Sequence, residues 1–227
     1  MFWKKEVFYL AQVNMDIDKI VKQVLLEISK QLEKVDNELI PVGVSNKHIH
    51  LSLHDLEILF GRGYKLTKTK DLQPGQYASK ETVEVIGPRG SFNKIRILGP
   101  TRVETQLEIS VSDSFTLGID PQIRESGKIQ NTPGILLRGP KGEVVIGSGV
   151  IVASRHIHLS TSYAKKYGYS DGELVSVTTS GARKTTFHNV TLRVADNFRP
   201  EIHIDVEETN ASGLKNGDLI KITREVV

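Results

Sequence analysis

The sequence predicts a mainly β protein built from two related β units with a few short helices. Three observations predict this fold class. After Pro41, short apolar runs alternate with glycine and proline along the chain. Many of these runs alternate polar and apolar residues or are rich in β-branched side chains, as strands are. Finally, the stretch SNKHIHLS at 45–52 returns as SRHIHLS at 154–160, which indicates a duplicated unit.

Length and composition are those of an ordinary globular protein. The 227 residues are enough for one large or two small cores, with 38% hydrophobic and 25% charged residues. A net charge of +3 is too balanced to indicate a nucleic-acid partner. There is no cysteine, so disulfides and thiolate metal sites are excluded. No apolar run is long enough to span a membrane, and we expect neither nucleic acid nor a membrane as a partner.

The N-terminal segment predicts an extension followed by an amphipathic helix. The first 14 residues lack the apolar core and the cleavage site of a signal peptide, so we interpret them as an upstream extension. Between residues 15 and 35, apolar side chains recur mostly at steps of three and four residues, as on one face of a helix. This helix either packs on the body of the protein or docks on another protein.

The other elements follow from local patterns. Ser52 and Ser160 are placed to cap a short helix after each His-Ile-His copy. Tight turns at GPRGS and GPKGE join hairpins. Closing each unit into a barrel would remove its edge strands, although the strand order does not follow from the pattern. Strands are predicted within VEVIGPRGS, KIRILGPTR, QLEISVSDSF, GILLRGPKGEVVIGSGVIVASR, ELVSVTTSG, NVTLRVADN, EIHIDV and DLIKITREVV.

The histidine pairs are the strongest chemical signal in the sequence. Residues two apart in a strand face the same side, so His48 and His50 share one face. His156 and His158 do the same in the second copy. Two imidazoles on one side of a strand can hold one cation such as zinc. The alternative is a strand whose histidines face solvent, but two copies in matching context favour a metal site.

A third strand repeats the pattern, with Glu201, His203 and Asp205 on one face. Five histidines do not complete two four-coordinate sites, so a carboxylate is the natural supplement, with one position left open for water or substrate. Strand parity does not choose among the candidate carboxylates, which are Glu104, Glu108, Glu201 and Asp205.

Two arginines are candidates to bind an anion that such cations would attract. Arg102 follows a Gly-Pro turn, and Arg193 lies within the strand VTLRVAD. A guanidinium binds phosphate through two parallel hydrogen bonds. In RESGK, the backbone N–H groups of Ser126 and Gly127 could cradle an oxyanion. For either arginine the alternative is a surface salt bridge.

Five motifs in order make the chain from Pro41 to its C-terminus resemble the PduL-type phosphate propanoyltransferases: GVSNKHIHLS, LGPTRVETQLEIS, LGIDPQIRESGKIQNTPGI, GVIVASRHIHLS and EIHIDVEETNASGL. This family comprises phosphotransacylases associated with propanediol-utilising bacterial microcompartments. The resemblance implies two antiparallel six-stranded β-barrels, with the first strand joining the C-terminal barrel. The implied division is an N-terminal extension and helix at 1–35, one barrel at 36–46 plus 154–227, and another at 47–153.

The resemblance also implies roles for individual residues. One zinc ion would be held by His48, His50 and Glu108, and the other by His156, His158 and His203. Arg102 and Arg193 would be catalytic. Phosphate would be bound by Arg102, Ser126 and Gly213. Coenzyme A (CoA) would be bound by Ser45, Lys70, Arg96, Leu98 and Asn210. Another divalent transition metal could replace zinc, because imidazole and carboxylate ligands also suit cobalt, nickel or iron.

The predicted activity is conversion of acyl-CoA and phosphate to acyl phosphate and CoA, by direct attack of metal-bound phosphate on the thioester. Propanoyl-CoA and acetyl-CoA are both candidate substrates. The absence of cysteine and of a Gly-x-Ser-x-Gly elbow argues against an acyl-enzyme. The alternatives are a binuclear zinc hydrolase that activates water, and a shell-associated binding module without chemistry.

The expected location is the bacterial cytoplasm or the lumen of a microcompartment. Shell or cargo proteins are the expected partners of the N-terminal helix, because that segment resembles the short amphipathic helices that address enzymes into microcompartments. A homodimer is a candidate assembly.

Overall fold

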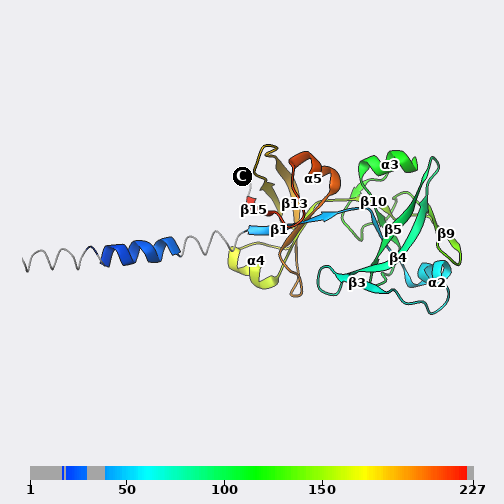
Figure 1. The fold of residues 1–227 in the computed structure, drawn as a ribbon, viewed down its shortest axis with the longest axis horizontal. Helices are drawn as coiled ribbons and strands as arrows, with labels where there is room; N and C mark the ends of the chain where they lie inside the picture. The colour runs from blue at the N-terminus through cyan, green and yellow to red at the C-terminus, as the bar shows by residue number, and fades with distance from the viewer. Residues whose placement is uncertain (1–16, 18, 30–38, 224–227) are drawn as a thin grey trace, which may run out of the picture. The chain divides into compact units, whose positions relative to one another are not determined.

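The computed structural model describes residues 17, 19–29 and 39–223 (Figure 1). The fold is mainly β with short helices, as predicted, and its two sheets both lie in the compact unit Ile40–Val227. The predicted extension at 1–14 lies outside the described residues. The domain boundaries at 36–46 plus 154–227 and at 47–153 stay a prediction.

The first sheet is a closed six-stranded barrel in the order β1-β14-β11-β13-β12-β15. Strand β1 pairs with β14 from the far end of the sequence, so the first strand completes the C-terminal barrel, as the resemblance implied. Closure leaves the barrel without an edge strand. Its strands are β1 (Leu39–Ser45), β11 (His156–Leu159), β12 (Leu174–Thr178), β13 (Thr186–Val194), β14 (Glu201–Asp205) and β15 (Leu219–Thr223).

The second sheet has nine strands in the order β7-β10-β6-β2-β5-β4-β8-β9, with β3 paired to β4. It is curled, but no ladder closes it in the described part of the chain, which corrects the second six-stranded barrel. Its end strand β7 is only two residues long. Its strands are β2 (His48–His50), β3 (Lys68–Asp71), β4 (Tyr77–Ile86), β5 (Ser91–Gly99), β6 (Gln106–Glu108), β7 (Ile123–Arg124), β8 (Ile135–Arg138), β9 (Glu143–Ile146) and β10 (Val150–Ala153).

Both sheets mix parallel and antiparallel strands, which corrects the antiparallel barrels that the resemblance implied. In the barrel, β1 is parallel to β14 and β11 to β13. In the second sheet, β2 is parallel to β5, and β10 to β6 and β7. Parallel neighbours require a long connection, and the two repeats provide one each: helix α2 (Leu53–Phe60) follows β2, and α4 (Thr161–Tyr167) follows β11. Ser52 and Ser160 cap these helices, as predicted.

Two further helices, α3 (Val111–Leu117) and α5 (Val206–Ser212), lie where the sequence analysis expected strands or made no prediction. Only Gln106–Glu108 of the predicted strand QLEISVSDSF is extended. Helix α3 begins with a capping box, in which the side chains of Ser110 and Asp113 each accept the other's backbone N–H, and α5 begins with the same arrangement. Ser-x-x-Asp is a local signature of a helix start, so the sequence did contain this signal.

Each sheet encloses its own apolar core, and the His-Ile-His strands contribute to both. Ile49 and Leu51 lie in the core of the second sheet, and Ile157 and Leu159 in that of the barrel. All four side chains are fully buried, and each such burial stabilises the fold by roughly 1.5–3 kcal/mol. Because strand side chains alternate, the histidines between them face the opposite side. The predicted alternation is confirmed.

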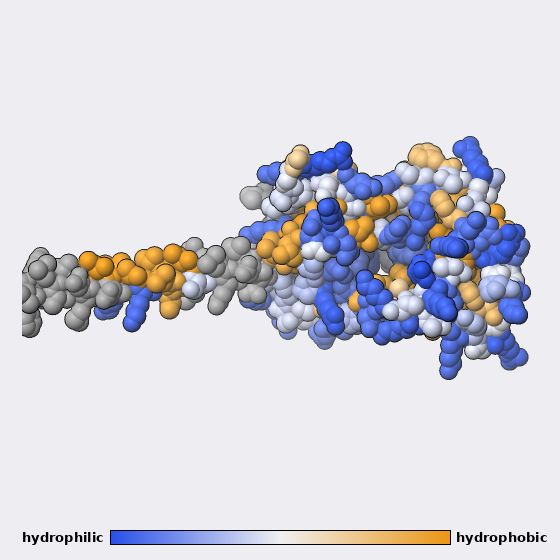
Figure 2. Space-filling model, viewed as in Figure 1, coloured by the Kyte–Doolittle hydropathy of each residue, from blue (hydrophilic) through white to orange (hydrophobic). Residues whose placement is uncertain are grey.

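Residues 17 and 19–29 are helical, and the rest of the helix predicted at 15–35 lies outside the described residues. Its apolar side chains are about half exposed: Val21 is 48% and Leu26 60% accessible. Figure 2 shows these side chains as an orange row along the helix. None of the described helices is long and apolar enough to cross a bilayer.

Candidate active site and metal centre

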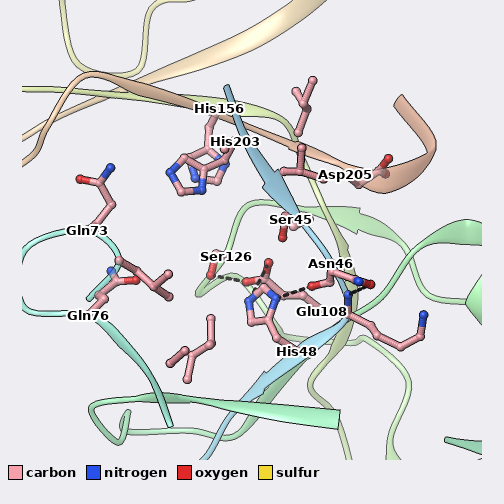
Figure 3. A pocket seen from close by; sticks show the side chains of 18 of the residues that line it. Ser45, Asn46, His48, Gln73, Gln76, Glu108, Ser126, His156, His203 and Asp205 are labelled. Atoms are coloured by element: carbon pink, nitrogen blue, oxygen red, sulfur yellow. Dashed lines mark hydrogen bonds and ion pairs between the residues drawn. The ribbon is translucent and has the colours of Figure 1, made fainter. Parts of the chain in front are cut away.

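A cavity of about 420 Å³ is lined by both sheets, within the range of small-molecule sites. Figure 3 shows His48 and Glu108 of the second sheet, and Ser126 of the turn after β7, across from His156 and His203 of the barrel. Two predicted site residues, Asn210 and Gly213, are not part of the cavity lining. They lie at the C-terminal end of α5, where the Asn210 carbonyl accepts a hydrogen bond from Arg183 at 2.6 Å. The other predicted site residues line the cavity: Ser45, His48, His50, Lys70, Arg96, Leu98, Arg102, Glu108, Ser126, His156, His158, Arg193 and His203.

Strand register brings the first histidine pair next to a carboxylate. Strand β2 lies between β5 and β6, so His48 is paired with Arg96 on one side and with Glu108 on the other. Directly opposite residues project from the same face of a sheet. The register therefore places Glu108 with the histidines, whereas Glu104 lies in an exposed bend.

The second pair is assembled in the same way in the barrel. Strand β11 lies between β13 and β14, so His156 is paired with His203, and His158 with both Arg193 and Glu201. The ring centroids of the three histidines are 4.7 Å, 4.9 Å and 5.1 Å apart. Three imidazoles from two neighbouring strands thus gather on the cavity side of the barrel.

His48, His50 and Glu108 are the described residues whose ligand atoms converge, all within 4.8 Å of one another. His48 Nδ1 donates to the Asn46 carbonyl at 2.8 Å. Its Nε2 is left as the ligand atom, 3.4 Å from Glu108 Oε2. Two imidazoles and a carboxylate with one position left open are a donor set that fits a divalent transition metal.

The second triad is arranged more loosely. His156 Nδ1 donates to the Ser154 carbonyl at 3.0 Å, which repeats the contact of His48 and leaves Nε2 for the cavity. Among the described residues, His158 Nδ1 is buried without a hydrogen-bond partner. His203 Nε2 lies 2.9 Å from Glu201 Oε2. In the part of the chain that the structure describes, the ligand atoms of His156, His158 and His203 do not form a group as close as that of His48, His50 and Glu108. A second metal site therefore stays a prediction.

A buried network fixes Glu108. Gln106 Nε2 and Ser126 Oγ donate to Glu108 Oε1 at 2.6 Å and 2.9 Å, so the other oxygen is left for the cavity. Arg102 in turn donates to Ser126 Oγ at 2.9 Å. Gln106 was not predicted, although it shares strand parity with Glu108. Its Oε1 accepts the Gly127 N–H at 2.6 Å, so this N–H is not free to cradle an oxyanion, contrary to the prediction.

Two half-buried arginines, Arg102 and Arg193, make the cavity attractive to an anion. Burial lowers the pKa of Arg102, the carboxylate of Glu108 works against this, and the charge of Arg193 lowers the pKa further. Burial also lowers the pKa of Arg193. Both groups remain charged at neutral pH. Two neighbouring guanidinium groups in a partly dehydrated cavity favour a bound anion such as phosphate.

Burial in the cavity lowers the pKa of three of its histidines, which keeps them neutral. Burial, with the charges of His48 and Arg102, lowers the pKa of His50 to about 2. Burial, with the charges of His203 and Arg193, lowers that of His158 to about 3. Burial likewise holds the pKa of His156 well below its usual range. Neutral imidazole is the form that binds metals, so these side chains are in the protonation state that a ligand needs. In this structure His50 Nε2 accepts a hydrogen bond from Arg102 at 2.8 Å.

Comparisons with known proteins identify one family. A family model described as phosphate propanoyltransferase matches residues 41–215. A phosphate propanoyltransferase of Thermotoga maritima is 51% identical over 183 residues, covering 80% of this chain and 87% of that protein. Proteins of the same name from Rhodopseudomonas palustris and Rhodobacter capsulatus are 46% and 48% identical, each covering 92% of this chain and 97% of the relative.

Proposed function

Because the chain belongs to the phosphate propanoyltransferase family, we propose that it transfers the acyl group of propanoyl-CoA or acetyl-CoA to phosphate, releasing acyl phosphate and CoA. The observation that carries this proposal is one cavity in which Arg102 and Arg193 lie beside the His48, His50 and Glu108 group. An anion-binding wall beside a metal-binding triad suits an enzyme whose nucleophile is an inorganic anion.

In the proposed mechanism, Arg102 and Arg193 bind hydrogen phosphate and orient it toward the thioester. A phosphate oxygen attacks the carbonyl carbon, the new C–O bond forms and the C–S bond breaks. The phosphate proton ends on the CoA sulfur, so charge and atoms balance. Arg102 also stabilises the oxyanion that develops on the carbonyl oxygen. Holding both substrates in one cavity supplies much of the rate through orientation.

His48, His50 and Glu108 would hold one metal ion, for which we propose zinc. His156, His158 and His203 would hold a second. When bound, such ions supply positive charge that neutralises phosphate and favours departure of the thiolate. The hydrogen bonds from His48 and His156 to backbone carbonyls support this assignment, because they direct the free Nε2 atoms to the cavity.

The predicted CoA contacts are supported to different degrees. Ser45, Lys70, Arg96 and Leu98 line the cavity, and two of them carry positive charge that suits the phosphates of CoA. Asn210 lies outside this lining, as does the predicted phosphate contact Gly213. Their assigned roles have no support from the cavity.

The proposal predicts that release of CoA from propanoyl-CoA depends on phosphate. The chain has no cysteine, so a thiol reagent detects only the CoA that is released. We expect CoA to appear in proportion to acyl phosphate, and only background release when phosphate is omitted. Equal release with and without phosphate would instead identify the hydrolase, in which water is the nucleophile.

We further propose that the N-terminal helix docks on a shell or cargo protein of a bacterial microcompartment. The half-exposed apolar side chains of residues 19–29 support this proposal. Leu25→Asp should abolish co-sedimentation with shell proteins and leave turnover unchanged, because it disrupts only the apolar face. Lys22→Ser on the same helix is the matched control. Co-sedimentation that survives Leu25→Asp would refute this role.

A further inference from the structure

Gln73 joins the two sheets at the wall of the cavity. It lies in the turn between β3 and β4, and residues 70–73 and 76 of this segment line the cavity. Although it lies in a turn, Gln73 is only 4% exposed. Both polar atoms of its amide contact the barrel: Nε2 donates to Glu201 Oε2 at 2.6 Å, and Oε1 accepts the Arg199 backbone N–H at 3.1 Å. Figure 3 shows Gln73 on the opposite side of the cavity from Ser45 and Asp205.

Glu201 links this contact to the proposed active site. The carboxylate oxygen that accepts from Gln73 also lies 2.9 Å from His203 Nε2. On its other side the carboxylate packs on Gly43, where an added Cβ would lie 3.0 Å from the carboxyl carbon.

We infer that Gln73 is a positioning residue that couples docking of the β3–β4 turn to the orientation of His203. With the turn docked, Gln73 fixes Glu201, and Glu201 fixes the His203 ring toward the cavity. With the turn released, the carboxylate loses its amide donor and the ring is less constrained. This inference rests on the proposed function, since it assigns His203 to the acyl-transfer site.

The same coupling extends to acyl-CoA. Lys70, a proposed CoA contact, lies in β3 at the base of the turn. A ligand that binds Lys70 in its docked position stabilises the docked turn, and by linkage the docked turn strengthens binding of that ligand.

A second contact between the sheets provides a matched control. Glu207 of helix α5, which follows barrel strand β14, accepts hydrogen bonds from the backbone N–H groups of Val111 and Ser112 in α3, at 3.1 Å and 2.8 Å. Glu207→Ala therefore removes an inter-sheet contact that does not involve Glu201 or His203. It separates a loss of positioning from a general loosening of the two sheets.

Residue-resolved hydrogen exchange tests the contact without using activity. In Gln73→Ala, the Arg199 amide loses its acceptor and should exchange at least about tenfold faster. In Glu207→Ala it should exchange at the wild-type rate, whereas the amides of Val111 and Ser112 accelerate. An unchanged Arg199 amide in Gln73→Ala would overturn the inference, whether or not the proposed function holds.

Kinetics test the coupling to His203. We expect Gln73→Ala and Glu201→Ala each to lower kcat about tenfold, and the double variant to lose no more than either single variant, since both remove one shared interaction. Glu207→Ala should stay within about twofold of wild type. Independent losses that multiply in the double variant, or an equal loss in Glu207→Ala, would contradict the inference. Wild-type protein without phosphate-dependent CoA release would instead refute the proposed function.

Discussion

Arg102→Ala is expected to lower kcat/KM for phosphate by about a hundredfold or more, with metal content unchanged. Arg102 is half-buried beside a second guanidinium group and hydrogen-bonds Ser126, so its loss would remove both the proposed phosphate ligand and the proposed donor to the developing oxyanion. Losing one such donor costs enzymes roughly 10²–10³ in rate. The measurement is initial rate against phosphate concentration, together with metal analysis of the same sample.

Two further variants help to interpret the result for Arg102→Ala. Arg102→Lys should restore only part of the activity, because an ammonium group lacks the planar fork that binds phosphate through two hydrogen bonds. Arg138→Ala should behave as wild type, since Arg138 is an exposed residue paired with Glu84 and Glu143. Metal loss in Arg102→Ala would show that the arginine holds the site together and does not act on phosphate.

His156→Ala is expected to remove one of the two proposed ions and to reduce turnover at least about a hundredfold. Its Nδ1 donates to the Ser154 carbonyl, so Nε2 is the atom that faces the cavity as a ligand. Removing a residue that hydrogen-bonds a metal ligand typically lowers metal affinity or activity 10–100-fold. Removing the ligand itself should lower turnover by more. The measurement is metal per chain by elemental analysis, with activity on the same preparation.

His188→Ala is the matched control for this variant. His188 hydrogen-bonds Ser176 at 2.8 Å in the barrel and is not part of the cavity lining, so metal content and rate should be retained. If His156→Ala kept both ions and full turnover, the barrel triad would have no metal role.

Local patterns in the sequence predicted the parts of the site that depend on neighbouring residues. The alternation of His48, Ile49 and His50 predicts an imidazole face and a core face, because strand side chains alternate. Ser52 and Ser160 predict helix starts, because a cap satisfies N–H groups within the next turn. Helix α3 was missed although Ser110 and Asp113 carry the same kind of signal: the apolar residues nearby favoured a strand.

Features that depend on strand register could not be predicted in this way. Glu104 and Glu108 have the same parity, and only the pairing of β2 with β6 places Glu108 opposite His48. The resemblance had suggested this assignment, but the residues alone did not. The contact of Gln73 with Glu201 joins the β3–β4 turn to the barrel across 128 residues of sequence. A contact over such a separation produces no periodic pattern in the sequence. The parallel pairs were missed for the same reason, since strand direction depends on connections.

Histidines from both repeats line one cavity, and we propose that they hold the divalent metal needed for acyl transfer to phosphate. The most direct test is elemental analysis of the purified chain, followed by phosphate-dependent CoA release after chelation and after metal is restored. We expect about two ions per chain, loss of activity on chelation and recovery with zinc or another divalent transition metal. Full phosphate-dependent turnover by metal-free protein would contradict it.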